Sequence, residues 1–191
     1  LSPALTMRLI AEEQKLGTME LLMTSPLKDF EIVIGKFLAA LSIIIVMIIG
    51  TFFYPIILII FGVPDFGPIF TGYLGLILYS SSTLSVGIFA SSLSSNQLVS
   101  LVVGSGILSF LTFIDFVSSR LSGAFGTILN ELQLGGSFSL FDSSSFGIAE
   151  GGHFADFARG IINVYDIIFY ISVSTIFLVL TIFSLESRRW R

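Results

Sequence analysis

The run Phe37–Phe61, FLAALSIIIVMIIGTFFYPIILIIF, decides the fold because it contains no charged residue. About 20 predominantly apolar residues are enough to cross the hydrocarbon core of a bilayer as a helix. The run is longer than this, and therefore predicts a transmembrane helix with some tilt. Pro55 predicts a kink within it, which membrane helices tolerate when neighbouring groups satisfy the freed backbone.

Three further apolar runs follow, at 69–93, 97–114 and 164–185, and each is long enough to cross a membrane. The run 69–93 is unusually rich in glycine, serine and threonine. Small residues let membrane helices approach closely, and hydroxyl groups form hydrogen bonds between them. We therefore expect this second span to pack inside a bundle of helices.

The composition supports the same fold class. The chain has 191 residues, of which 54% are hydrophobic and 12% charged, and its mean hydropathy is +0.98. A typical soluble domain contains about 25% charged residues. No basic stripe is present, so nucleic acid is excluded as an expected partner. The absence of cysteine excludes disulfides, thiol catalysis and thiolate metal sites. We predict an all-α membrane protein, a polytopic bundle of transmembrane helices.

The organisation follows from these runs. Residues 1–36 are charged, residues 37–185 form the transmembrane domain, and residues 186–191 form a short polar tail. Between the third and fourth spans lies a long segment, 115–163, of mixed character. Apolar residues recur in it at helical spacing and predict short amphipathic helices, at Phe125, Ile128, Leu129 and Leu132, and again at Phe154, Phe157 and Ile161.

The basic residues predict the orientation, because cytoplasmic loops carry an excess of lysine and arginine. With residues 1–36 inside, four spans place the segment 115–163 outside and the C-terminus inside. The inside segments then contain Arg8, Lys15, Lys28, Lys36, Arg188, Arg189 and Arg191, whereas the outside ones contain Arg120 and Arg159. We therefore predict a multi-pass protein with a cytoplasmic C-terminus, and we expect Trp190 to lie at the membrane interface.

The charged stretch Met7–Lys36 predicts a helix, a break at Gly17 and a further helix that enters the first span. Thr18 is suited to cap the following helical segment, with Glu20 close to its positive N-terminus. Lys28 and Lys36 share one helical face and are expected to meet anionic lipid headgroups. Two alternatives remain at this point: a surface linker with solvated charges, and an amphipathic interfacial helix of the kind found in unrelated membrane proteins.

A resemblance distinguishes between these interpretations. Residues 7–41, MRLIAEEQKLGTMELLMTSPLKDFEIVIGKFLAAL, resemble the cytoplasmic segment of ABC-2-type permeases. The positions that carry the resemblance are Met7, Arg8, Glu12, Glu13, Gly17, Thr18, Glu20, Leu21, Leu22, Pro26, Gly35 and Lys36. The C-terminal stretch 157–190, FARGIINVYDIIFYISVSTIFLVLTIFSLESRRW, is similar to the subgroup that includes gliding-motility-associated permeases.

The resemblance implies properties that composition does not. Family members usually have six spans, so the four visible here are expected to be the last four, with Leu1–Ala11 ending the second. The segment Met7–Pro26 would contain the coupling helix that docks on a separate cytoplasmic ATPase subunit. The residues implied in this coupling are Glu12, Glu13, Gly17, Thr18, Glu20, Leu21, Leu22 and Pro26.

The resemblance also implies partners and a compartment. The permease would work as a homo- or heterodimer with two ATPases, as an exporter in a prokaryotic plasma membrane. ATP and Mg would bind to the partner, because this chain has no GxxxxGK[ST] phosphate loop and is not expected to be an enzyme. Membrane lipid is the remaining expected partner. The apolar walls do not identify the substrate.

Other candidate sites are weaker. A carboxylate within a span marks a candidate functional site. Asp166, near the outer end of the last span, is expected either to be solvated at the interface or to form a candidate outer-gate pair with Arg159, and direct contact with substrate is the weaker alternative. His153, beside two glycines, is expected to be a loop residue, and no metal site is predicted around it. Two alternative functions stay open: a non-transporting membrane scaffold for an ATPase-driven assembly, and an intramembrane enzyme, for which Asp166 alone is insufficient.

Overall fold

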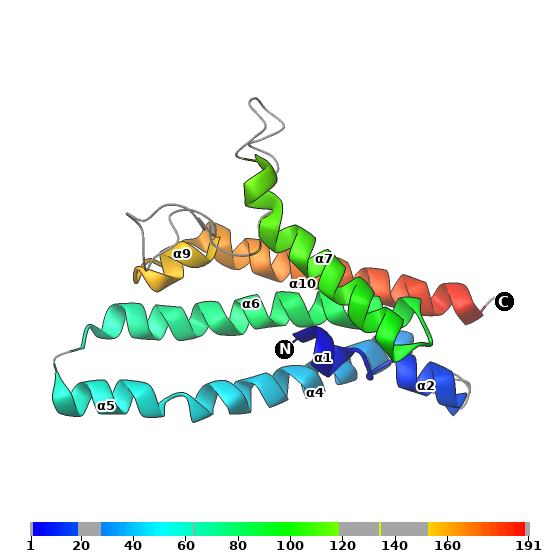
Figure 1. The fold of residues 1–191 in the computed structure, drawn as a ribbon, viewed down its shortest axis with the longest axis horizontal. Coiled ribbons are helices and arrows are strands. Elements are labelled where there is room, and N and C mark those ends of the chain that lie inside the picture. The colour runs from blue at the N-terminus through cyan, green and yellow to red at the C-terminus, as the bar shows by residue number, and fades with distance from the viewer. Residues whose placement is uncertain (1, 19–27, 63, 119–133, 135–152, 190–191) are drawn as a thin grey trace. The chain divides into compact units, whose positions relative to one another are not determined.

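The computed structural model describes residues 2–18, 28–62, 64–118, 134 and 153–189, and every regular element in them is an α-helix (Figure 1). The elements are α1 (Ser2–Thr6), α2 (Ala11–Leu16), α4 (Asp29–Gly50), α5 (Phe53–Phe61), α6 (Phe66–Leu93), α7 (Gln97–Ser118), α9 (His153–Ala158) and α10 (Val164–Arg189). Four helical stretches are long and apolar enough to cross a membrane: Asp29–Phe61, Phe66–Leu93, Gln97–Ile114 and Val164–Ser187. The predicted all-α polytopic fold is confirmed.

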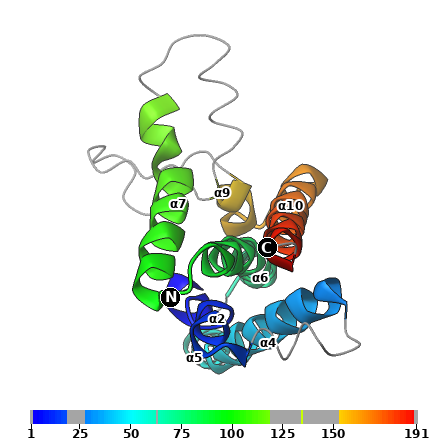
Figure 2. The same cartoon turned by 90° about the vertical axis from the view of Figure 1, so that its right-hand side faces the viewer.

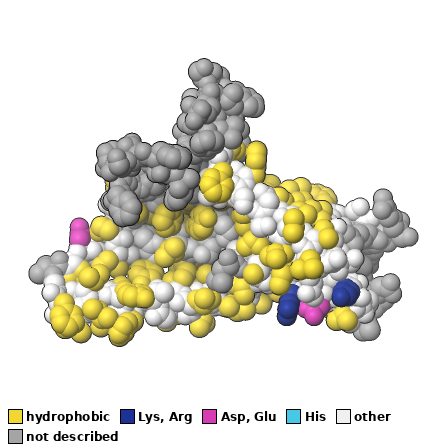
Figure 3. Space-filling view, viewed as in Figure 1, with side chains coloured by type: hydrophobic (Ala, Val, Ile, Leu, Met, Phe, Trp, Pro, Cys, Tyr) yellow, Lys and Arg dark blue, Asp and Glu magenta, His cyan; other side chains and the backbone are white. Residues whose placement is uncertain are grey.

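Helix α6 is the most buried of these four stretches. In its most apolar window 56% of the residues are buried, against 6% for Asp29–Phe61 and 17% for each of the other two. Its buried face carries hydroxyl groups, with Ser82, Ser85, Ser91 and Ser92 all fully buried. Hydrophobic side chains cover much of the face shown in Figure 3. The expectation that the second span packs inside the bundle is therefore confirmed.

The first apolar stretch is interrupted between α4 and α5, where Thr51 and Phe52 form a turn. Pro55 has no N–H group to donate to the carbonyl of Thr51, four residues earlier, so a regular helix cannot continue there. The Tyr73 hydroxyl on α6 donates to this carbonyl at 3.0 Å, and its ring stacks on Phe52 with ring centroids 4.6 Å apart. The predicted effect of Pro55 is confirmed. The Thr51 carbonyl also accepts from the Tyr54 N–H at 3.0 Å, and the neighbouring helix supplies its second donor.

The chain forms two compact units. Unit 1 contains Leu1–Ile45, Ser80–Leu108 and Ile171–Arg191, and unit 2 contains Val46–Tyr79 and Ser109–Tyr170. The core of unit 1 takes one buried residue from each of four parts of the chain, namely Ile10, Val33, Ile88 and Leu185. Within this unit, α1 and α2 lie against the C-terminal end of α6, with α4 and α10 alongside (Figures 1 and 2).

Candidate functional site

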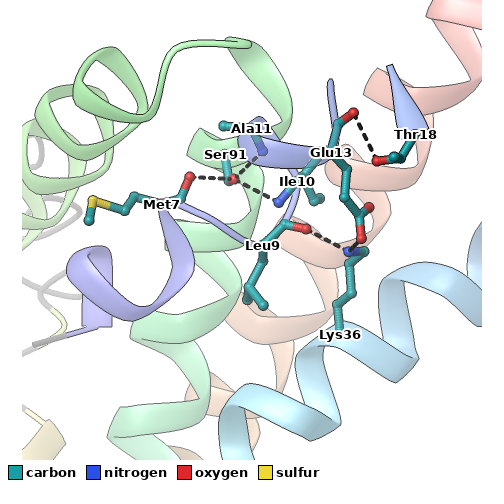
Figure 4. Close-up of polar contacts among 8 residues, drawn as sticks. All are labelled: Met7, Leu9, Ile10, Ala11, Glu13, Thr18, Lys36 and Ser91. Atoms are coloured by element: carbon teal, nitrogen blue, oxygen red, sulfur yellow. Dashed lines mark hydrogen bonds and ion pairs between the residues drawn. The ribbon is translucent and has the colours of Figure 1, made fainter. Parts of the chain in front are cut away.

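The first candidate site is the break between α1 and α2, which Ser91 of α6 joins to the bundle (Figure 4). The Ser91 hydroxyl accepts hydrogen bonds from the backbone N–H groups of Ile10 at 3.1 Å and Ala11 at 3.0 Å. It also donates to the carbonyl of Met7 at 3.2 Å. These backbone groups have no partner of their own within a helix, because they lie where one helix ends and the next begins.

Lys36 of α4 holds the same break from another side. Its ammonium group donates to the carbonyl of Leu9 at 2.5 Å and pairs with the Glu13 carboxylate at 2.6 Å. The Lys36 side chain is 15% exposed and that of Glu13 is 30% exposed, so solvent screens this pair only in part. Lys28, in contrast, is exposed. The expected contact of Lys28 and Lys36 with lipid headgroups stays a prediction. We call Met7–Ala11, Glu13, Lys36 and Ser91 together the α1–α2 junction.

None of the described residues covers the C-terminal end of α2. Gly17 ends the helix in the left-handed conformation, at φ 72°, which favours glycine. The preceding Leu16 exposes 68% of its surface, and the hydroxyl of Thr18 donates to the carbonyl of Glu13 at 3.3 Å. Lysine and arginine side chains on this face of unit 1 lie near α2 (Figure 3). The α2 tip, residues 16–18, thus exposes an apolar side chain close to charged ones.

The second candidate site is in unit 2, where the short helix α9 packs on α6 and α10. Phe157 is completely buried, and its carbonyl accepts a hydrogen bond from the Thr71 hydroxyl at 2.7 Å. Its ring lies so close to Gly75 that an added Cβ there would be 2.8 Å from it. The Tyr170 hydroxyl donates to the carbonyl of Leu134 at 2.9 Å. We call these contacts of α9 and its neighbours the α9 contact site.

A buried acid–histidine pair completes the α9 contact site. His153 Nδ1 of α9 lies 2.6 Å from Asp166 Oδ1 in the first turn of α10, and their side chains are 7% and 5% exposed. The imidazole also stacks on Phe169, with ring centroids 3.9 Å apart. Asp166 Oδ2 is buried without a hydrogen-bond partner among the described residues. A pair so removed from solvent is costly to break, because removal of the imidazole would leave the Asp166 carboxylate buried without its partner.

The predicted Arg159–Asp166 pair is therefore wrong in the described structure, since His153 contacts Asp166 and Arg159 is exposed. The reason is geometric. Gly160, at φ 87°, turns the chain directly after α9, and the Arg159 N–H is used in helix-end bonds to the carbonyls of Ala155 and Asp156. The expectation of a loop position for His153 is also wrong, because this residue begins α9 and is buried.

Comparison with known families supplies the remaining observation. The sequence model of one family, described as ABC-2 family transporter protein, matches residues 3–188. The chain belongs to this family. No curated protein sequence and no solved structure matches the chain significantly. As a multi-pass member of this family, the protein is a membrane permease component, and the family implies an ATPase partner.

The ABC-2 motif positions are distributed unevenly in the structure. Glu12 and Glu13 belong to α2, Gly17 ends it, and Lys36 reaches back to Glu13. Thr18, directly after Gly17, is exposed. The other predicted coupling positions and one predicted interface residue lie outside the described residues: Glu20, Leu21, Leu22, Pro26 and Trp190. The predicted amphipathic helix around Phe125–Leu132 also lies outside them. Among the motif residues that the structure describes, Glu13 and Lys36 therefore contact each other directly.

Sequence reasoning did not single out Ser91, although a signal for it was present. Gly87 and Ser91 are four residues apart, so they share one face of α6. A Cβ at Gly87 would overlap the Thr6 hydroxyl of α1, and Ser91 contacts the next residues of the same segment. A glycine followed one turn later by a serine therefore marks the face on which the N-terminal segment lies. Within the described part of the chain, no group of three potential metal ligands occurs.

Proposed function

We propose that this ABC-2 protein is the transmembrane subunit of an ATP-driven exporter, coupled through Met7–Pro26 to a separate ATPase subunit. The observation that carries the proposal is the two-sided character of α2. Its first turn is joined to α6 and α4 through Ser91 and Lys36, whereas its tip, with Leu16, is exposed. An element that is held by the spans at one end, and that no described residue covers at the other, is suited to receive a partner.

The mechanism follows from this attachment. Closure of two ATPase subunits on ATP would displace the Met7–Pro26 segment of each permease in a homo- or heterodimer. The displacement would rock the spans 33–61 and 69–93, and so alternate access between the two membrane faces. ATP and Mg would remain on the ATPase. The similarity of residues 157–190 to gliding-motility-associated permeases supports a prokaryotic plasma membrane as the location.

The proposed orientation places residues 1–36 and 186–191 in the cytoplasm, and the segment 115–163, with α9, on the outer side as a gate. It is supported by the excess of basic residues in the cytoplasmic segments. The chain contains no cysteine, so single cysteines report accessibility without background. Lys15→Cys should react with a membrane-impermeant maleimide only after cell lysis, and Asp65→Cys in intact cells. The opposite pattern would contradict the orientation.

The coupling proposal is tested by co-purification of the tagged permease with co-expressed ABC ATPases, beginning with any encoded beside its gene. Glu20→Lys and Leu16→Asp should each strongly reduce the ATPase retained, because one reverses a charge and the other places a carboxylate in an apolar contact. Asp65→Lys is the matched control, since it makes the same charge reversal at an exposed turn outside the proposed docking segment. Undiminished retention in both Glu20→Lys and Leu16→Asp would argue against docking through this segment.

A further inference from the structure

The break between α1 and α2 differs from a flexible hinge because another helix supplies hydrogen-bond partners for its backbone groups. Helix α2 begins without a capping side chain of its own, because the residue at its N-cap position, Ile10, is apolar and makes no side-chain bond. The first N–H groups of such a helix are normally left to water or to a local serine, threonine or aspartate. Here Ser91, from a different helix, occupies that role for the Ile10 and Ala11 N–H groups.

Water does not compete for these bonds. Ile10, Ala11 and Ser91 are all fully buried. If the hydroxyl of Ser91 were removed, two buried N–H groups would have no replacement acceptor, and a buried donor without a partner is strongly unfavourable. The contact between α2 and α6 is therefore held by directional bonds as well as by apolar packing. The nearby close approach of Gly87 to Thr6 also restricts sliding of α1 along α6.

Lys36 adds a second, independent attachment. It contacts the break at the Leu9 carbonyl and α2 itself at Glu13. Its bond to a carbonyl of the break would persist even if Glu13 were neutralised. Gln14 makes a third contact, donating from its side chain to the Ser92 carbonyl at 3.3 Å. Helix α2 is thus bound to α4 on one side and to α6 on the other.

We propose that Ser91 and Lys36 are positioning residues that fix α2 to α6 and α4, so that the three move as one rigid body when an ATPase displaces α2. Ser91 joins α2 to α6, and Lys36 joins α2 to α4. Without them α2 would pivot at the break, and ATP-driven displacement would be absorbed there. This inference rests on the proposed coupling function, but its rigidity claim concerns the permease alone.

The first test measures rigidity in the permease alone, without any ATPase. Spin labels at Lys15→Cys on α2 and at Leu93→Cys on α6, or at Leu38→Cys on α4, report the two distances by pulsed electron–electron double resonance in nanodiscs. All three labelled positions are exposed. Ser91→Ala should broaden the 15–93 distance distribution and leave the 15–38 distribution nearly unchanged, whereas Lys36→Met should do the reverse. A general loss of structure would broaden both.

Matched controls are present in the chain. Ser92→Ala removes a buried hydroxyl that bonds only to the Phe89 carbonyl of its own helix, and Lys28→Met removes an exposed charge of α4's N-terminal side. Neither should change either distribution. Ser91→Thr, which keeps a hydroxyl, should restore the narrow 15–93 distribution. If the unsubstituted permease already has a distribution as broad as that of Ser91→Ala, the proposed rigid attachment is overturned.

The second test uses the permease–ATPase complex trapped with ATP and vanadate. In the unsubstituted junction, both distances should stay the same with and without nucleotide. In Ser91→Ala the 15–93 distance should shift on trapping, while ATPase retention and ATP hydrolysis persist, because Ser91 is buried away from the α2 tip. An equal shift in the unsubstituted complex would overturn the inference. Failure of the ATPase to bind the unsubstituted permease would instead contradict the coupling function, and the first test would still decide the rigidity claim.

Discussion

Each compact unit holds a short helical element against α6, but the two units use different chemistry. In unit 1 the α1–α2 junction is held through backbone groups, which a serine and a lysine of other helices satisfy. Its one ion pair, Glu13–Lys36, is partly exposed. In unit 2 the α9 contact site contains a buried acid–histidine pair, His153–Asp166, beside hydroxyl-to-carbonyl bonds from Thr71 and Tyr170.

The difference predicts which substitutions lower the stability of the protein at each site. A partly exposed ion pair contributes little to stability, because water and salt screen it. A buried pair contributes little as a whole but a great deal when one partner is removed. Loss of a charge should therefore be tolerated at the junction and not at the α9 contact site, whereas loss of a hydroxyl should matter at both.

The largest expected effect is that of His153→Ala. Removal of the imidazole leaves the Asp166 carboxylate buried and unpaired, and should lower the free energy of unfolding by about 3–5 kcal/mol. The measurement is unfolding by SDS titration in bicelles. Glu13→Gln at the junction, measured in the same way, should cost only about 0–1 kcal/mol.

Two further variants make this prediction specific. The double substitution of His153 and Asp166 by leucine should recover most of the loss, because no buried charge remains. Arg159→Ala should change stability by less than about 0.5 kcal/mol, as is usual for an exposed side chain, since no described residue pairs with it. If Arg159→Ala lowers the free energy of unfolding as much as His153→Ala, Asp166 pairs with Arg159 and not with His153.

The next largest effect concerns the two close approaches to α6, one in each unit. An alanine Cβ at Gly75 would lie 2.8 Å from Phe157, and one at Gly87 would overlap the Thr6 hydroxyl and lie 3.0 Å from its Cβ. Overpacking of this kind costs about 1–3 kcal/mol. Gly72→Ala is the control, because nothing lies within 4 Å of the added Cβ. If all three variants unfold at the same SDS fraction, α9 and α1 do not pack on these glycines.

A smaller effect separates hydroxyls that serve another element from those that serve their own helix. Thr71→Val keeps the shape of the side chain but removes the shorter of two hydrogen bonds to the Phe157 carbonyl, which also accepts from the Gly160 N–H at 3.3 Å, and should cost about 1 kcal/mol. Thr175→Val is the matched control, since its exposed hydroxyl bonds only to the Ile171 carbonyl within α10. Equal losses in the two variants would mean that the inter-element bond of Thr71 adds nothing.

The parts of this fold that sequence predicts well are those governed by local properties. The absence of charge over a stretch such as Phe37–Phe61 is a property of neighbouring residues, and a single residue, Pro55, determines where its helix is interrupted. The glycine and hydroxyl content of 69–93 likewise predicted the burial of α6. None of these inferences required knowledge of which helices are neighbours.

The parts that failed depend on pairing between distant residues. Ser91 bonds to Ile10, 81 residues away, and no local pattern fixes that register. The pairing of Lys36 with Glu13 was not predicted either, because it forms only where the chain folds back and places α2 within reach of α4. Asp166 was assigned to the nearest opposite charge in the sequence, Arg159, although a helix end and a glycine turn separate them.

The smallest expected effect tests the break between α4 and α5, which resembles the α1–α2 junction in that an α6 hydroxyl bonds to a backbone group of the break. Tyr73→Phe should lower the free energy of unfolding by about 0.5–1 kcal/mol, because the Thr51 carbonyl loses one of its two donors and keeps only the Tyr54 N–H. In a Pro55→Ala background, residue 55 regains an N–H group that is positioned to serve this carbonyl, so Tyr73→Phe should then cost almost nothing.

This double-mutant cycle also distinguishes two roles for Tyr73, whose hydroxyl lies 3.1 Å from the Thr51 hydroxyl as well as 3.0 Å from the Thr51 carbonyl. Only the carbonyl bond is made redundant when the proline is removed. An interaction energy near zero in the cycle would therefore assign the contribution of Tyr73 to the Thr51 hydroxyl, or to stacking changes at Phe52. Thr51→Val in the unsubstituted background separates these two, since it removes the hydroxyl and keeps both the carbonyl and the stacked rings.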